Sequence, residues 1–260
     1  MTTMAHALTD SNTMLRRQLL HLRRYPSLTV MLIGLPVVFL LLFVYVFGGA
    51  VGAAIEGGRS GYVNYLTPGI LLFTVAGAAA GPAIAVASDM TEGIVDRFRS
   101  MAIARGALLT GHVLGSLVQN ILAVVAVLGA ALLIGFRPTA TPVEWLAVFG
   151  VLLATAFALT WFAVALGMVA DSVETASNTP MFLSLLPFLG SGFVPTDTMP
   201  SGLQAFAEHQ PFTPIIETLR GLLLGTGIGN SAVVALAWCA GISLVSYLWA
   251  KRSYNKRTTR

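Results

Sequence analysis

The chain has 260 residues, of which 10% are charged and 56% hydrophobic, and its mean hydropathy is +0.80. Soluble domains carry about 25% charged residues, and a soluble globule with this much apolar surface would aggregate. The high apolar content therefore excludes an ordinary soluble enzyme and a disordered chain. The single cysteine excludes a disulfide scaffold. We expect an all-α, polytopic membrane protein.

Six apolar segments are long enough to cross a bilayer, because a spanning helix needs about 20 mostly apolar residues. In chain order they cover 28–47, 60–88, 106–136, 145–170, 175–196 and 221–250. The fifth is interrupted by Pro180 and Pro187, and the sixth is expected to span from about Gly227. The first is interpreted as a retained span, because its apolar run is longer than that of a signal peptide. We predict six transmembrane helices in a domain of residues 28–250.

The positions of the basic residues predict the orientation. All but three of the 15 lie before the first span, between the second and third, or in the basic tail 251–260; the exceptions are Arg59, Arg137 and Arg220. Loops rich in Lys and Arg face the cytoplasm. We therefore expect both termini in the cytoplasm and interpret the net charge of +4 as a sign of topology, with no nucleic-acid partner.

Residues 1–27 are predicted to form a cytoplasmic tail that contains an amphipathic helix over 11–24. Leucines recur there at helical spacing, at positions 15, 19 and 22. Such a helix lies in the membrane surface with its arginines at lipid headgroups. The four basic side chains are Arg16, Arg17, Arg23 and Arg24. Two roles stay open, namely a topology anchor alone or a further contact with a cytoplasmic partner.

The loop between the second and third spans predicts a second surface helix, over about 89–105. Asp89 followed by Glu92 resembles a capping box. Apolar residues share one face of this helix and acidic residues come early, which suits the helix dipole. Its charges are either simply solvated or part of a surface that docks another protein.

The segment 195–220 is too apolar for a free external loop and too rich in proline for a span. Non-helical backbone at membrane depth survives only against protein or water. We therefore predict a re-entrant helical hairpin at the external leaflet, marked by Pro195, Pro211 and Pro214. Glu217 and Arg220 are three residues apart and are expected to pair on one helical face. Its role is either a structural clasp or an external gate.

The sequence lacks a source of energy for transport. A phosphate-binding loop needs G-x-x-x-x-G-K-[ST], and the only two lysines, Lys251 and Lys256, are both followed by arginine. The spans hold almost no ionisable residue that could couple an ion gradient, and no catalytic or metal-ligand pattern stands out. Energy for uphill transport is therefore expected from another chain.

Two blocks resemble the type-2 ATP-binding-cassette (ABC) exporter permeases, in particular the daunorubicin/doxorubicin-resistance branch. The first is MTEGIVDRFRSMAIARGALLTGHVLG, Met90–Gly115, and the second is FLGSGFVPTDTMPSGLQAFAEHQPFTPIIETLRGLLLG, Phe188–Gly225. The order of surface helix, six spans and basic tail agrees over nearly the whole chain. One departure is Ala102–Ala104, where the family pattern has a proline soon after the arginine-rich turn.

The resemblance implies a bacterial plasma-membrane permease that exports a hydrophobic, drug-like substrate. It implies a second permease subunit, identical or homologous, and separate ATPase subunits that carry ATP and Mg, with no cofactor in this chain. The coupling residues that match the family are Glu92, Gly93, Asp96, Arg97 and Phe98. The helix with Arg16–Arg24 matches the connecting helix, and the hairpin caps the substrate path, whose lining residues stay unassigned. The alternatives are a permease for lipid or lipid-linked glycan and an ion-coupled carrier.

Overall fold

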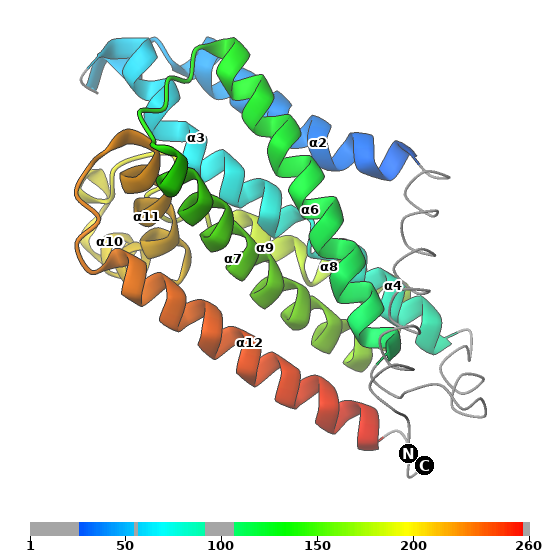
Figure 1. Ribbon diagram of the computed structural model, residues 1–260. Coiled ribbons are helices and arrows are strands. Elements are labelled where there is room, and N and C mark those ends of the chain that lie inside the picture. The colour runs from blue at the N-terminus through cyan, green and yellow to red at the C-terminus, as the bar shows by residue number, and fades with distance from the viewer. Residues whose placement is uncertain (1–25, 55–56, 92–106, 257–260) are drawn as a thin grey trace.

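The computed structural model describes residues 26–54, 57–91 and 107–256, and all regular structure in these ranges is helical (Figure 1). The prediction of an all-α fold is therefore confirmed. The predicted surface helix at 11–24 and the residues from 92 to 106 lie outside the described ranges, and so does the end of the basic tail.

Five helical segments of the described chain are long and apolar enough to cross a membrane. They agree with the predicted first, second, third, fourth and sixth spans to within a few residues at most ends. Their bounds are α2 Pro26–Leu41 continued by η1 Leu42–Phe47, α3 Gly58–Gly77 with α4 Ala80–Thr91, α6 Ala107–Ile134, α7 Pro142–Val169 and α12 Ser231–Lys256.

Local chemistry explains two irregularities in these spans. The helix of the second span is interrupted between α3 and α4, because Pro82 has no backbone N–H and its ring would clash with the carbonyl four residues earlier, at Ala78. The first span ends in a π-helix, and Arg59 donates from Nε to the Val44 carbonyl there, at 3.1 Å. Asp89 lies inside α4, so the helix start expected at this residue is not seen.

The predicted fifth span is not one helix. It forms the short helices α8 Val173–Asn178 and α9 Met181–Leu185, followed by consecutive turns over 186–193 and a bend at residue 194. Pro180 lies between the two helices and Pro187 follows the second, and proline interrupts a helix because it cannot donate the backbone hydrogen bond. The six predicted spans, the fifth of them predicted to be interrupted, thus correspond to five candidate membrane-spanning helical segments and one broken segment in the described chain. We call residues 186–194 the turn segment.

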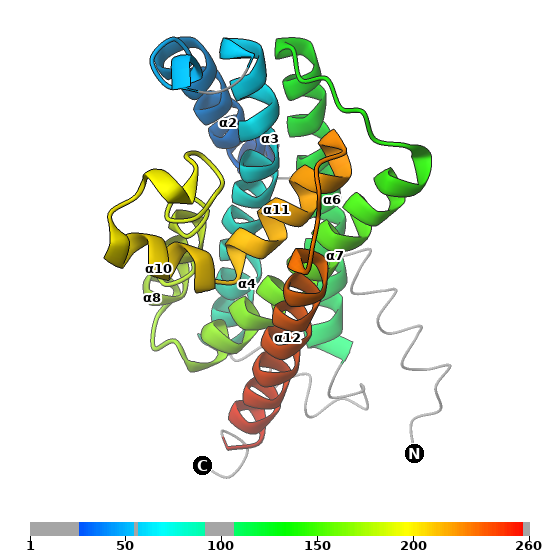
Figure 2. The same cartoon turned by 90° about the vertical axis from the view of Figure 1, so that its left-hand side faces the viewer.

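The predicted hairpin corresponds to two helices after the short η3, Thr196–Thr198. These are α10 Ser201–His209 and α11 Phe212–Leu224, so the second arm continues four residues past the predicted end. Nine of the 13 residues of α11 are buried, which shows that this arm packs into the bundle. Figure 2 shows α11 crossing the middle of the bundle, beside α3 and α7, with α10 at its edge.

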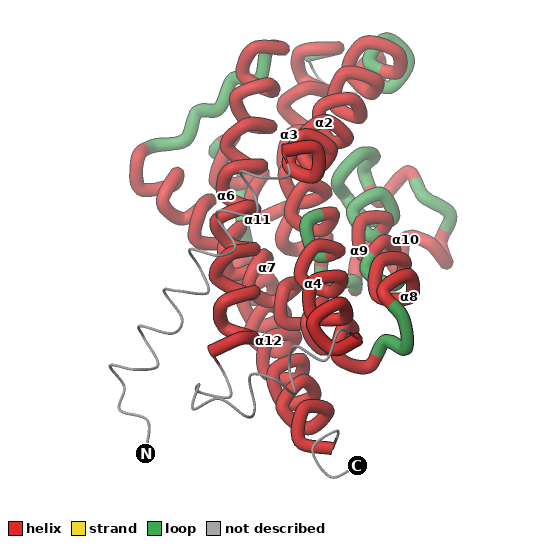
Figure 3. Tube along the Cα trace, turned by 90° about the vertical axis from the view of Figure 1, so that its right-hand side faces the viewer, coloured by secondary structure: helices red, strands yellow, loops and turns green. Residues whose placement is uncertain are grey.

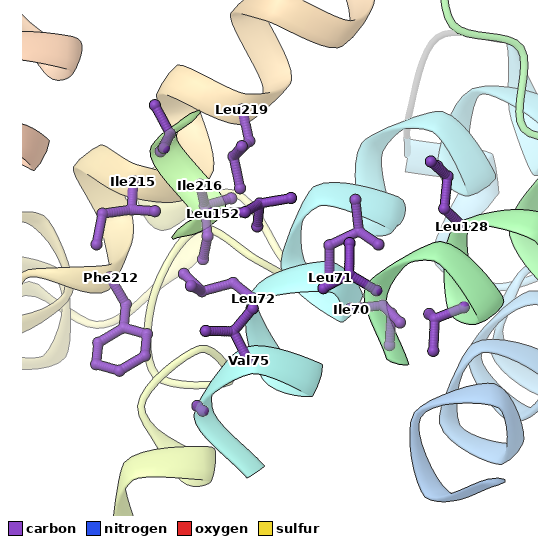
Figure 4. Close-up of a cluster of buried hydrophobic side chains, with 14 of the residues drawn as sticks. Ile70, Leu71, Leu72, Val75, Leu128, Leu152, Phe212, Ile215, Ile216 and Leu219 are labelled. Atoms are coloured by element: carbon purple, nitrogen blue, oxygen red, sulfur yellow. The ribbon is translucent and has the colours of Figure 1, made fainter. Parts of the chain in front are cut away.

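The long helices form a slanted bundle in which α12 runs along α7, α7 along α4, and α3 along α6 (Figures 1 and 3). The connection from η1 to α3 and the end of α6 lie at one end of the bundle, and α4, α7 and α12 end at the other. The core joins α3, α6, α7 and α11. Figure 4 shows part of it, with buried side chains that include Ile70, Leu72, Leu128, Leu152, Phe212 and Ile216.

Candidate functional site

The three prolines predicted for the hairpin lie at its turning points. Pro195 precedes η3, and Pro211 occupies the N-cap position of α11. Pro214 lies in the first turn of α11, where a missing N–H costs nothing because the first turn has no intrahelical acceptor. Gln210 breaks the helix between the arms with extended backbone. Pro211 and Pro214 therefore mark the start of the second arm, whereas the first arm starts after Pro200, its N-cap residue.

Arg220 joins the hairpin to two other elements. Its Nη2 donates to the Ser191 carbonyl in the turn segment at 2.6 Å, and to the Tyr65 carbonyl in α3 at 3.4 Å. Its guanidinium carbon also lies 3.9 Å from the centre of the Tyr65 ring, in cation–π geometry. The Tyr65 hydroxyl donates to the same Ser191 carbonyl at 2.9 Å. One carbonyl thus receives a donor from α3 and a donor from α11.

Glu217 and Arg220 do not form the expected ion pair. The Glu217 carboxylate instead accepts a hydrogen bond from the Ser231 hydroxyl at the start of α12, at 3.2 Å. The reason is direction: Arg220 points toward α3 and the turn segment, whereas Glu217 points toward α12. Glu217 and Arg220 therefore connect α11 to different neighbours.

Side chains from outside the turn segment satisfy several of its backbone groups. Gln210 donates to the Leu186 carbonyl at 3.0 Å, and the Tyr62 hydroxyl lies 3.5 Å from the Phe193 carbonyl. The backbone N–H of Ser191 donates to the Thr213 hydroxyl at 3.4 Å. Non-helical backbone can persist in an apolar environment only when such partners exist. Side chains of α3 and α11, and that of Gln210 between the two arms, thus make the broken fifth segment possible.

Glycine allows the turn segment to come this close. A Cβ on Gly192 would lie 2.8 Å from the Pro187 carbonyl and 3.3 Å from Cα of Gly69 in α3. A Cβ on Gly190 would lie 2.7 Å from the Thr213 hydroxyl. A side chain at position 192 would therefore clash with backbone, and one at position 190 would have to displace the side chains of Gln210 and Thr213. The turn segment fits between α3 and α11 because both residues are glycine.

On its other side, the turn segment carries part of an aromatic cluster. Phe188 and Phe193 stack with ring centres 4.0 Å apart, and both contact Phe43 of η1. Phe39 and Phe73 meet Phe188 edge to face. These contacts attach the turn segment to α2 and α3 by apolar burial. The segment therefore has an aromatic face and a polar face.

The polar face contains three buried side-chain atoms that have no hydrogen-bond partner in the described chain. They are Oγ of Ser191, Oε1 of Gln210 and Nε of Arg220. Ser191 and Gln210 are 3% and 5% exposed, so bulk water does not reach them in this conformation. An unpaired buried polar atom is costly, which makes this the least satisfied region of the described structure.

The other predicted site residues lie outside the described ranges, namely Glu92, Gly93, Asp96, Arg97 and Phe98 and the arginines 16, 17, 23 and 24. Sequence reasoning missed Tyr62, Tyr65, Ser191 and Gln210. The two tyrosines are three apart near the start of the second span, so they share one helical face. That spacing was a readable signal for a polar contact inside an apolar span.

Comparison with known proteins assigns the class. Residues 10–224 match the family described as "ABC-2 type transporter", so the chain belongs to this family of membrane transporters. It is 30% identical over 244 residues to the daunorubicin resistance ABC transporter permease protein DrrB1 of Streptomyces coeruleorubidus, covering 93% of this chain and 84% of the relative. It is 23% identical over 233 residues to the probable doxorubicin resistance ABC transporter permease protein DrrC of Mycobacterium tuberculosis, covering 87% and 81%. The chain is therefore a multi-pass transport subunit of the permease type.

Proposed function

We propose that this chain is the membrane half of an ATP-driven exporter that removes hydrophobic, drug-like compounds from the cell. The observation that carries the proposal is the family match over most of the chain, together with relatives whose names describe drug-resistance permeases. The absence of a phosphate-binding loop from the sequence supports a division of labour. In this proposal a separate ATPase subunit binds ATP and Mg, and two permease subunits enclose the path.

In the proposed orientation, both termini and the 92–105 loop lie in the cytoplasm. The distribution of basic residues supports this. The helices that flank this loop and the tail support it as well, since α4 and α12 end at the same end of the bundle. Glu92, Gly93, Asp96, Arg97 and Phe98 would contact the ATPase, and the arginines 16, 17, 23 and 24 would hold the N-terminal helix at anionic lipid. The hairpin, with Pro195, Pro211, Pro214, Glu217 and Arg220, would close the external side.

Charge reversal tests the coupling role. The chain is produced together with its ATPase subunit, and ATP hydrolysis and anthracycline export are measured in reconstituted vesicles. We expect Glu92→Lys and Asp96→Lys to lose substrate-stimulated hydrolysis and export while the complex still assembles. Glu208→Lys is the matched control, because Glu208 is exposed on α10 and hydrogen-bonds only Gln204. Export by the purified permease without any ATPase would overturn the proposal.

The substrate requires a separate comparison. Vesicles containing the complex are supplied with an anthracycline, a fluorescent phospholipid or a lipid-linked glycan. ATP-dependent movement of the anthracycline alone supports drug export, whereas movement of either lipid supports the alternative permease. Transport that persists without ATP and collapses with an uncoupler identifies an ion-coupled carrier. A wild-type complex with no ATP-dependent transport of any of these compounds contradicts the proposed function.

A further inference from the structure

We propose that Tyr65 and Arg220 form a releasable clamp on the Ser191 carbonyl, and that opening of this clamp frees the turn segment during transport. The role in transport rests on the proposed function, whereas the clamp itself rests on the contacts alone. Tyr65 and Arg220 are positioning residues in this proposal, since they hold the turn segment in place and do not touch the transported compound.

The geometry concentrates the attachment on one backbone atom. The Ser191 carbonyl receives Oη of Tyr65 at 2.9 Å and Nη2 of Arg220 at 2.6 Å. The two side chains also contact each other in cation–π geometry, with the guanidinium carbon of Arg220 3.9 Å from the centre of the Tyr65 ring. A displacement of Ser191 therefore breaks both hydrogen bonds together, which makes the attachment cooperative.

The direct contacts of Arg220 are with groups that water can replace. They are two neutral carbonyls and an aromatic ring, whereas the Glu217 carboxylate hydrogen-bonds Ser231 and acts on Arg220 only through space. An Arg that is buried against a carboxylate would be costly to separate, because each charge would lose its partner. A guanidinium bound to carbonyls can exchange them for water as the segment moves. The contact is thus suited to open and close again.

The two faces of the turn segment differ in what opening costs. The face toward α2 is held by the phenylalanine cluster around Phe188 and Phe193 and stays buried. The face toward α11 has glycine at 190 and 192, so little apolar area separates there. It also holds the unpaired atoms of Ser191, Gln210 and Arg220, which gain partners when water enters. The segment should therefore pivot on its aromatic face and open at its polar face.

The single cysteine of the chain makes this movement measurable. Cys239 is 5% exposed, and its replacement in a Cys239→Ser variant leaves a background without cysteine. Ser191→Cys then places a reporter under the clamp, at a position whose hydroxyl makes no hydrogen bond in the described chain. The readout is the rate at which a membrane-impermeant maleimide labels this cysteine in membranes without nucleotide.

We expect slow labelling with the clamp intact and faster labelling when it is weakened. Tyr65→Phe keeps the ring and removes one hydrogen bond, so the labelling rate should rise by up to about tenfold. Arg220→Gln removes the charge and the stacking and should raise it further. Thr218→Val is the matched control on α11, because its hydroxyl bonds only within the helix, to Pro214, and it should change nothing.

Two measurements separate a clamp from general loosening. In a chain that keeps Ser191, labelling of the native Cys239 should stay slow in Tyr65→Phe; an equal increase there overturns the proposal. In the complex with the ATPase, ATP should accelerate labelling of Ser191→Cys with an intact clamp and have little further effect in Tyr65→Phe. A rate that does not depend on ATP in the intact clamp assigns a purely structural role and also overturns it.

The outcomes distinguish this proposal from the proposed function. Unchanged labelling of Ser191→Cys in both Tyr65→Phe and Arg220→Gln disproves the clamp, whatever the complex transports. A wild-type complex that shows no ATP-dependent export disproves the function, even if the nucleotide-free labelling behaves as expected. Full support requires that Tyr65→Phe and Arg220→Gln speed up labelling of Ser191→Cys. It also requires that complexes with these two substitutions still hydrolyse ATP but no longer export substrate.

Discussion

Gly192 in the turn segment packs directly on Gly69 of α3, so that a Cβ on Gly69 would lie 2.8 Å from Cα of Gly192. Gly69→Ala should therefore displace the turn segment or α3, at a cost of about 1–3 kcal/mol. Thermal unfolding in detergent measures the loss. Gly77→Ala on the same helix is the control, since nothing lies within 4 Å of its Cβ position. Equal stability of the two variants would contradict the close contact.

Two hydroxyls at the turn segment should respond in opposite ways to removal. Thr213 accepts from the Ser191 N–H and donates to the Ala207 carbonyl, so Thr213→Val should lower the free energy of unfolding by about 1–3 kcal/mol. The Ser191 hydroxyl has no partner in the described chain, so Ser191→Ala should be neutral or slightly stabilising. Denaturation of the two variants side by side tests this, and a large loss in Ser191→Ala would show that an internal water satisfies the hydroxyl.

The stacked pair in the turn segment should make Phe193 sensitive to a change of shape. Phe193→Leu keeps an apolar side chain but loses the stacking on Phe188 and the contact with Phe43, and we expect a loss of about 1–2 kcal/mol. Phe157→Leu is the control, because Phe157 is 41% exposed. Thermal stability of both purified variants is compared, and a larger effect at Phe157 would speak against the aromatic attachment.

The start of α7 depends on a reciprocal cap. Glu144 N–H donates to the Thr141 hydroxyl at 3.4 Å, and Thr141 N–H donates to the Glu144 carboxylate at 2.6 Å. Thr141→Ala should cost about 1 kcal/mol, since the helix loses its side-chain cap. Thr139→Ala in the same loop is the control, because its backbone N–H keeps the bond to Leu223. Hydrogen exchange at the first turn of α7 should rise only in Thr141→Ala.

Hydropathy predicted the long helices well because a span is a local property. The predicted third span, 106–136, became α6, Ala107–Ile134, and the fourth, 145–170, became α7, Pro142–Val169. The cap Thr141–Glu144 was also readable from spacing, although the apolar run placed the helix start three residues later. The interruptions of the fifth segment were read from its prolines, but the same apolar composition still favoured a span.

The contacts of Arg220 could not be predicted from the sequence, because its partners lie far away along the chain. Its helical neighbour Glu217 was the obvious partner in sequence, whereas the Ser191 carbonyl is 29 residues away and Tyr65 is 155 residues away. The spacing of small residues is equally local. Gly77 and Gly81 are four residues apart, yet nothing described lies within 4 Å of a Cβ built on either of them. The tight contact lies at Gly69. Only the packing of the bundle decides which glycine faces a neighbour.

The 28-residue helix α7 has a mechanical consequence for the whole subunit. Near its start, Thr139 donates its backbone N–H to the Leu223 carbonyl at the end of the hairpin, at 2.9 Å. Near its other end, a Cβ on Gly167 would lie 3.1 Å from Cα of Ala83 in α4. The helix is about 42 Å long and continuous, so it behaves as a rod between these two points. A tilt of α11 must therefore either be carried to α4 by this rod or be absorbed at one of its two joints.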